Sequence, residues 1–174
     1  ILVMLFWYDV GVAGESRTLF QSKLGFEFDV SPIFVVETDE ERGVEKIEFK
    51  EDRGGYIMIM KIKIPSSYVV PTSTEQFEKE ACDAVVTDFI GHTFKGYDLV
   101  SCGLSNISKF NSVYYIVQDE GFFKKHYLHN FTILHNGFGY KIGFSCATDL
   151  GCREKEYNIL KTELIKIAES FDIN

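Results

Sequence analysis

The segment from Tyr127 to Phe171 constrains the fold more than any other part of the chain, because two strand patterns and a helix pattern follow one another there. The strand patterns are HYLHNFTILH and FGYKIGFSCA, and the dipeptide Asn136-Gly137 separates them. Asn-Gly readily adopts positive φ at both central positions of a type I′ turn. The segment therefore predicts an antiparallel hairpin.

The helix pattern after the hairpin supplies a partner for one of its faces. Its apolar residues recur every three or four positions, which places them on one stripe: Tyr157, Leu160, Leu164, Ile167 and Phe171. In the second strand, alternation places one set of apolar side chains on a single face: Tyr140, Ile142, Phe144 and Cys146. We expect the helix to cover that face and Lys141, Gly143 and Ser145 to lie on a wetter one.

Upstream patterns predict a larger antiparallel sheet. Strands are expected at residues 26–30, around 47–49 and at 56–64, and again at 97–108 and 112–120. The charged run ETDEERG separates the first two of these strands. A helix is expected from Thr74 to Ile90, because Ser73 and Gln76 form a capping-box pair and Gly91 follows the last apolar position. The buried stripe of this helix comprises Phe77, Ala81, Val85 and Phe89.

The predicted order is three strands, a helix, four strands and a helix. This order defines an α+β fold, with an antiparallel sheet of six to seven strands packed with two helices. A chain of 174 residues fits one domain of this kind. Its formal net charge of −8 argues against nucleic acid as a partner, because phosphate binding requires a basic face.

The four cysteines, Cys82, Cys102, Cys146 and Cys152, do not have zinc-site spacing. They can be buried thiols or can form disulfides, in which case three connectivities are possible. The residues predict no metal site and no cofactor.

The first eight residues, ILVMLFWY, are apolar but far fewer than the roughly 20 that a transmembrane helix needs. Small residues at Val12 and Gly14 are typical of a signal-peptidase site before Glu15. Residues 1–14 are therefore either the remnant of a signal peptide or an N-terminal strand, and residues 15–174 are expected to form a single domain.

The chain contains no motif of a catalytic or nucleotide-binding site, such as GxSxG, HExxH or a Walker loop. His126, His129 and His135 share one strand pattern, but His126 faces the opposite side from the other two. His129 and His135 are separated by roughly 20 Å at ~3.3 Å per residue, too far to ligate one metal. We therefore predict no catalytic residues and no enzymatic activity.

The turn Glu120–Lys125 is the candidate partner-binding site, because it holds Phe122 and Phe123 beside Lys124 and Lys125. An exposed aromatic next to two lysines has the composition of an anchor for a protein partner or an anionic membrane surface. Alternatively, both rings fold back onto opposite sides of the sheet edge.

Several of these elements together resemble the PsbP-like proteins, named for the extrinsic subunit of photosystem II. The resemblance rests on FEFDVSP, the YIMIMKIKIP strand, the first helix, the GFGYKIGFS strand and the ending LIKIAESFDIN. The same fold occurs in a Ran-binding nuclear import factor and in bacterial exported proteins and lipoproteins. The resemblance implies a PsbP-like sandwich that acts by docking on partners and has no catalytic residues.

We thus expect an exported, non-enzymatic binding domain that docks on a protein partner or a membrane-associated assembly. One alternative is a cytosolic adaptor like the import factor. Another is a small-ligand carrier or enzyme with a pocket between helix and sheet.

Overall fold

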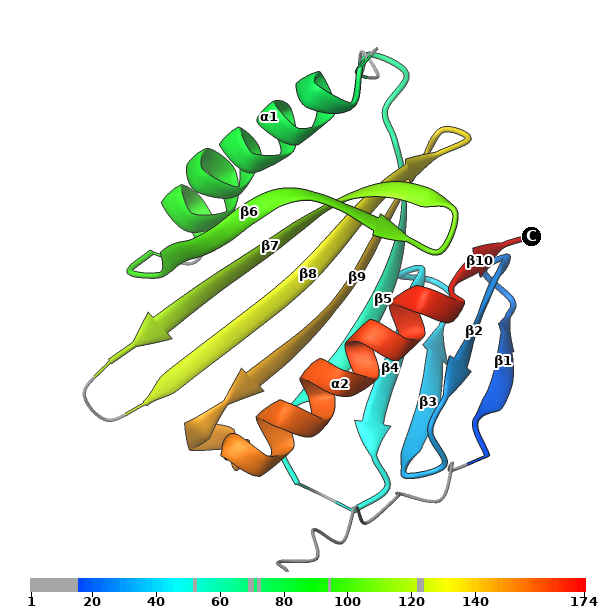
Figure 1. Ribbon diagram of the computed structural model, residues 1–174, viewed down its shortest axis with the longest axis vertical. Helices are drawn as coiled ribbons and strands as arrows, with labels where there is room; N and C mark the ends of the chain where they lie inside the picture. The colour runs from blue at the N-terminus through cyan, green and yellow to red at the C-terminus, as the bar shows by residue number, and fades with distance from the viewer. Residues whose placement is uncertain (1–15, 52, 69–70, 72, 94, 122–123) are drawn as a thin grey trace, which may run out of the picture.

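The computed structural model describes residues 16–174 except 52, 69–70, 72, 94 and 122–123. Five strands precede the first helix: β1 (Thr18–Ser22), β2 (Phe26–Val30), β3 (Phe34–Asp39), β4 (Val44–Phe49) and β5 (Tyr56–Lys63). Helix α1 (Thr74–Ala84) continues into a π-helix, η1 (Val85–Thr93). Four long strands follow: β6 (Asp98–Ile107), β7 (Phe110–Glu120), β8 (Lys125–His135) and β9 (Phe138–Ala147). The chain ends with η2 (Thr148–Leu150), α2 (Glu154–Ser170) and β10 (Asp172–Ile173) (Figure 1).

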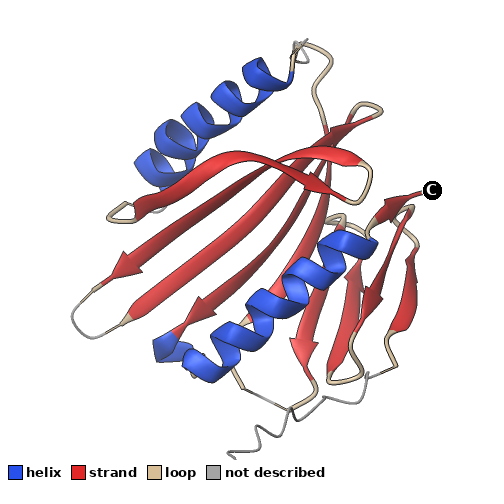
Figure 2. Ribbon diagram, in the orientation of Figure 1, coloured by secondary structure: helices blue, strands red, loops and turns tan. Residues whose placement is uncertain are grey.

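The strands form two antiparallel sheets. The larger sheet has seven strands in the order β3-β4-β5-β9-β8-β7-β6, and the smaller has three in the order β1-β2-β10. The predicted α+β class, with two helices and a sheet of six to seven strands, is therefore confirmed. Figure 2 shows α2 lying across the middle of the molecule and α1 at the β6–β7 side of the large sheet.

The predicted hairpin and its covering helix are both confirmed. Asn136 and Gly137 have φ values of 48° and 77°, and His135 pairs with Phe138 across the two-residue turn. The apolar stripe of α2 packs on the predicted face of β9, where Leu160, Leu164, Ile167 and Phe171 are at most 1% exposed. Tyr157, at the start of the stripe, is only partly buried.

Three strands lie outside the predicted set: β1, β3 and β10. Strand β3 includes the start of the acidic run, since Glu37–Asp39 pair with Val44–Lys46 of β4. It forms an edge of the large sheet, where charged side chains are tolerated because they reach water and discourage further pairing. Strand β1 is also an edge strand, and β10 contains only two residues, so neither has a strong alternating pattern.

The first helix begins as predicted but does not end as predicted. Ser73 caps it by accepting a hydrogen bond from the Gln76 amide at 3.1 Å. The chain then continues past Gly91 as a π-helix. At this transition the Thr87 hydroxyl donates to the Asp83 carbonyl at 2.8 Å, and such a bond competes with the regular backbone ladder. Of the predicted stripe, Val85 is buried and Phe77 and Ala81 are partly buried, whereas the Phe89 side chain lies outside the description.

All four cysteines form disulfides. Cys82–Cys102 links α1 to β6, and Cys146–Cys152 links β9 to the segment before α2. The first of the two alternatives for the cysteines, buried thiols, is therefore wrong.

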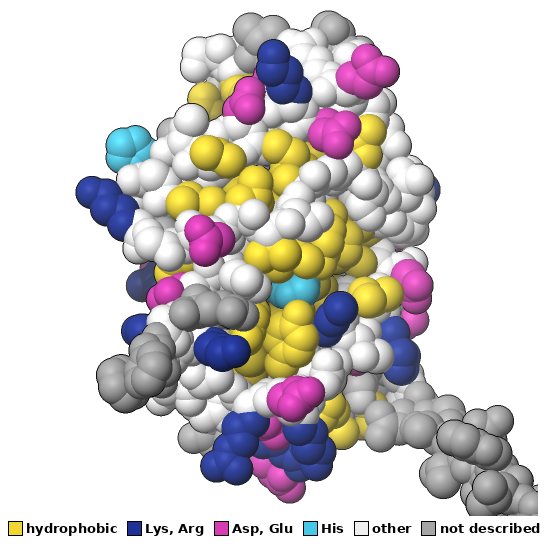
Figure 3. All heavy atoms as spheres, turned by 60° about the vertical axis from the view of Figure 1, so that its left-hand side comes forward, with side chains coloured by type: hydrophobic (Ala, Val, Ile, Leu, Met, Phe, Trp, Pro, Cys, Tyr) yellow, Lys and Arg dark blue, Asp and Glu magenta, His cyan; other side chains and the backbone are white. Residues whose placement is uncertain are grey.

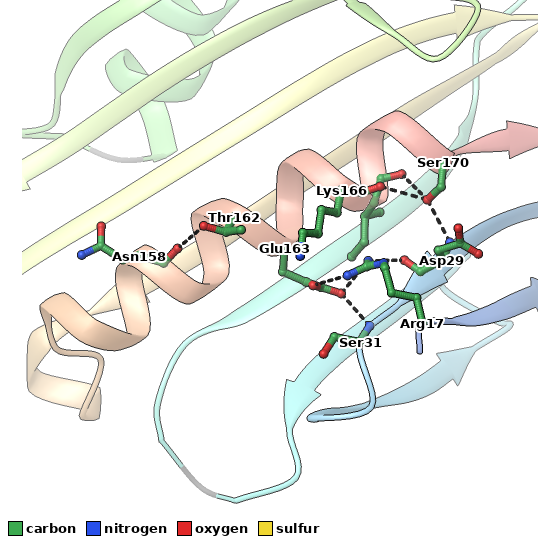
Figure 4. A network of polar contacts seen from close by, with 9 residues as sticks. Arg17, Asp29, Ser31, Asn158, Thr162, Glu163, Lys166 and Ser170 are labelled. Carbon is green, nitrogen blue, oxygen red and sulfur yellow. Dashed lines mark hydrogen bonds and ion pairs between the residues drawn. The ribbon is translucent and has the colours of Figure 1, made fainter. Parts of the chain in front are cut away.

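A polar network connects the start of the described chain to α2 (Figure 4). Both terminal nitrogens of Arg17 donate to the Glu163 carboxylate, at 2.8 and 2.9 Å, and the Ser31 amide donates to the same carboxylate at 2.8 Å. Glu163 is 4% exposed, so this carboxylate is buried together with its partners. The predicted boundary before Glu15 lies outside the described residues.

Candidate functional site

The candidate site is a cleft on the large sheet where strand β9 carries no side chain. Gly143 pairs with Met58 of β5 on one side and with Asn130 of β8 on the other. A cavity of about 190 Å³ lies at this position. Its lining is mostly apolar: Tyr56, Met58, Met60, Leu128, Asn130, Lys141, Gly143, Phe144 and Ser145.

The cleft lies on the face opposite α2. The row of cross-strand neighbours that contains Gly143 and Asn130 extends to Tyr115 of β7 and Cys102 of β6. Cys102 is the residue whose disulfide attaches α1 to this side of the sheet. Because α1 packs against β6 and β7, it covers that side of the face. A second, smaller core forms beneath α1 and η1, from Val85, Tyr115, Val117 and Leu128.

Asn130 is the most unusual residue in the cleft. Its side chain is 6% exposed, yet within the described part of the chain its Nδ2 atom has no hydrogen-bond partner. A buried donor without a partner costs about 1–3 kcal/mol, so native structures rarely contain one without a reason. Gly143 is required beside it, because a Cβ at position 143 would lie 2.1 Å from Asn130 Oδ1.

Lys141 supplies a positive charge at the same place. Its ammonium lies 5.5 Å from the centre of the Tyr115 ring, in a cation–π contact. Burial lowers the pKa of Lys141 to about 8. The amine is therefore mostly protonated at pH 7, but it is poorly hydrated, which strengthens its attraction to any anion that enters the cleft.

A histidine fixes one end of the cleft. His126 Nε2 and Ser145 Oγ are 2.7 Å apart, and His126 Nδ1 hydrogen-bonds with the Tyr97 hydroxyl. Burial lowers the pKa of His126, so its neutral form is favoured. This contact fixes the Ser145 side chain at the edge of the cleft.

The opposite face of the sheet holds a separate buried network around His129. The imidazole hydrogen-bonds with Tyr114 and Tyr157 through its two nitrogens, at 2.7 and 2.9 Å, and stacks on Phe144. Burial lowers the pKa of His129 to about 4 and raises that of Tyr114 to about 12. A neutral imidazole satisfies this arrangement, with one nitrogen donating and the other accepting.

The three histidines of β8 are thus separated as predicted: His126 faces the cleft, His129 contacts α2, and His135 packs edge-on against Phe110. Among the described residues, no group of three His, Cys, Asp or Glu side chains could hold a metal ion.

The structure describes only part of the predicted site at the β7–β8 turn. Phe122 and Phe123 lie outside the described residues. Lys124 pairs with Asp149 at 3.4 Å, and the Lys125 amide donates to Thr148 Oγ1 at 2.9 Å. This turn is therefore joined to η2, whose Leu150 is 70% exposed.

A second hollow, of about 480 Å³, lies between this turn and the start of α2. Its lining includes Lys125, Tyr127, Arg153 and Tyr157.

Figure 3 shows hydrophobic side chains gathered along the middle of one face, with charged groups at its ends.

Asn130 and Lys141 are site residues that were not predicted from the sequence. The available signal was the alternation in β9, which places Lys141, Gly143 and Ser145 together on its wetter face. The missing information was the register: only cross-strand pairing brings Asn130 of β8 and Met58 of β5 beside Gly143.

Comparison with solved structures defines the class of fold. Cyanobacterial PsbP from Synechocystis sp. PCC 6803 superposes with a TM-score of 0.56 at 15% identity, covering 94% of this chain and 96% of that protein. LpqN, involved in cell envelope biogenesis of Mycobacterium tuberculosis, gives 0.57 at 10% identity, with 91% of each chain covered. The chain therefore has the PsbP-like fold.

A protein of Bacteroides thetaiotaomicron also matches, with a TM-score of 0.55 at 14% identity. The match covers 92% of this chain but only 49% of the Bacteroides protein, so the chain spans about half of its length. No protein-family profile and no curated protein sequence matches the chain.

Neither α1 nor α2, nor any other helix in the described ranges, has both the length and the hydrophobicity needed to cross a bilayer.

Proposed function

We propose that this chain is an exported, non-enzymatic binding domain whose ligand site is the cleft at Gly143. The observation that carries the proposal is the buried Asn130 amide, whose Nδ2 has no hydrogen-bond partner in the described part of the chain. An apolar cavity with a few convergent polar groups is the usual form of a small-molecule site. Asn130 and Lys141 are such groups, and a ligand oxygen at Asn130 would satisfy the donor.

Export is supported by the two disulfides, because disulfides persist in oxidising compartments and are rare in the cytosol. The fold is also that of LpqN, which is involved in cell envelope biogenesis. N-terminal sequencing of protein isolated from its native cells tests this part of the proposal. A chain beginning at Glu15 supports export with cleavage, whereas retention of residues 1–14 in the mature protein contradicts that cleavage.

Ligand binding in the cleft is tested by a fragment screen with ¹⁵N-labelled full-length protein. We expect binding fragments to shift the amide signals of Gly143 and its neighbours Asn130 and Ser145. In Met58→Trp, the larger side chain fills the cleft and should abolish these shifts.

The matched control for that variant is Ile62→Trp. Ile62 lies on the same strand and face as Met58, is 51% exposed and does not line the cleft. Fragment shifts should persist in it. If fragments shift signals only elsewhere, or if Met58→Trp binds as well as the control, the cleft is not the ligand site.

A second candidate function is docking through the β7–β8 turn. It is favoured by the exposure of Leu150 in η2, the segment whose Asp149 and Thr148 contact Lys124 and Lys125. An exposed apolar side chain in a segment joined to a lysine-bearing turn fits a protein partner, or alternatively an anionic membrane surface.

The double change of Phe122 and Phe123 to Ser separates docking from a structural role of the turn. Under docking, the free energy of unfolding barely changes while partner capture or vesicle binding is lost. A loss of several kcal/mol in stability, with binding per folded molecule unaffected, would assign both rings to the core.

A further inference from the structure

The polar groups of the cleft also indicate what class of molecule it binds, and this inference rests on the cleft being the ligand site. Asn130 Nδ2 is a hydrogen-bond donor, and Lys141 is a cation. Both groups therefore favour an acceptor with negative charge. Two such groups match the two oxygens of one carboxylate.

Apart from Ser145, the rest of the lining is mainly apolar and belongs to three strands, β5, β8 and β9. Met58 and Met60 come from β5 and Leu128 from β8, with the Tyr56 ring at one end. Methionine side chains adapt to irregular apolar shapes, so this surface suits a hydrocarbon or aromatic body. A cavity of about 150 Å³ accommodates benzene, and this one is about 190 Å³, so the body should contain about six to eight carbons.

We propose that the cleft binds a small apolar monocarboxylate, with its carboxylate at Asn130 and Lys141 and its apolar body against Met58, Met60 and Leu128.

Other head groups fit less well. A primary ammonium would be repelled by Lys141 and would leave Asn130 Nδ2 without an acceptor. A neutral hydroxyl could accept from Asn130 but would not use the charge of Lys141. A phosphate would bring about two negative charges to a site with one identified cation.

Isothermal titration of the full-length chain at pH 7 with octanoate, 1-octanol and octylamine tests this assignment. The three probes share an eight-carbon body and differ in the head group. We expect octanoate to bind at least tenfold more tightly than 1-octanol and octylamine to show no binding.

Variants at position 141 identify the source of the discrimination. Lys141→Met keeps the length of the side chain and removes its charge, so it should weaken octanoate binding about tenfold and leave 1-octanol unchanged. Lys141→Arg retains the charge and should retain most of the preference for octanoate.

The outcomes separate the ligand class from the proposed function. If 1-octanol binds as tightly as octanoate, or if Lys141→Met binds octanoate like the wild type, the carboxylate assignment is overturned while the cleft remains a ligand site. If none of the three probes binds, the assignment is overturned as well, and the fragment screen with Met58→Trp decides separately whether the cleft binds anything.

Discussion

Gly143 and Asn130 are cross-strand neighbours on β9 and β8, and the asparagine occupies space that any side chain at position 143 would need. An ideal Cβ on Gly143 would lie 2.1 Å from Asn130 Oδ1 and 2.6 Å from the His129 carbonyl oxygen. The absence of a side chain at position 143 thus permits the conformation of Asn130, the main polar residue of the cleft.

Gly143→Ala should therefore destabilise the protein. Because both the side chain of Asn130 and the backbone of β8 would have to move, we expect a loss of about 1–3 kcal/mol in the free energy of unfolding, as for other overpacked sites. Urea denaturation measures this. Gly139→Ala, on the same strand, is the control: its Cβ would meet nothing closer than 3.9 Å, so its stability should stay within about 1 kcal/mol of the wild type. Equal stabilities for the two variants would show that Asn130 is not held against Gly143.

The stripe of α2 gives a prediction about the main core. Leu164 is 1% exposed and packs between α2 and the sheets, so Leu164→Ala should cost about 2–5 kcal/mol. Ile165→Ala is the matched control, because Ile165 is 45% exposed and should cost less than about 0.5 kcal/mol. A loss under ~0.5 kcal/mol for Leu164→Ala in denaturant melts would mean that the stripe faces solvent.

Some parts of this fold could be predicted from local sequence pattern, and others could not. The Asn136-Gly137 turn and the α2 stripe were predictable, because each depends on residues close together in the chain. Strand β3 was not, because its acidic residues suit a loop as well as an edge strand, and pairing with β4 decides between them. The cleft was beyond local pattern for the same reason: Met58, Asn130 and Gly143 meet only through the register of three strands.

The His129 network predicts a loss of stability on acidification. Burial lowers the pKa of His129 in the folded state to about 4, below the value of 6.5 of the unfolded chain. Between these two pH values the folded state binds fewer protons than the unfolded chain. The free energy of unfolding therefore has its full value above pH ~6.5 and falls progressively down to pH ~4. The shift corresponds to at most about 3 kcal/mol.

His129→Gln provides the comparison for this effect. Glutamine retains a donor and an acceptor but does not titrate, so the variant should be less stable at pH 7 and should lose less stability than the wild type between pH 6.5 and 4. The measurement is the free energy of unfolding at several pH values. Parallel curves for the two proteins would show that His129 does not contribute to the acid sensitivity.

The ion pair between Arg17 and Glu163 predicts where the folded domain begins. Arg17 donates twice to a carboxylate that is 4% exposed, so Arg17→Ala would leave a buried charge without its cation and should cost about 3–5 kcal/mol. Arg42→Ala is the control, since Arg42 pairs with Asp39 at the surface and should cost at most about 1 kcal/mol.

The contact between Arg17 and Glu163 also predicts the effect of truncation. Removing residues 1–14 should leave the stability unchanged, because Arg17 remains, whereas removing residues 1–17 should reproduce the loss of Arg17→Ala. If removal of residues 1–14 alone costs several kcal/mol in denaturant melts, that segment is part of the folded core and the interpretation of residues 1–14 as a cleaved signal is wrong.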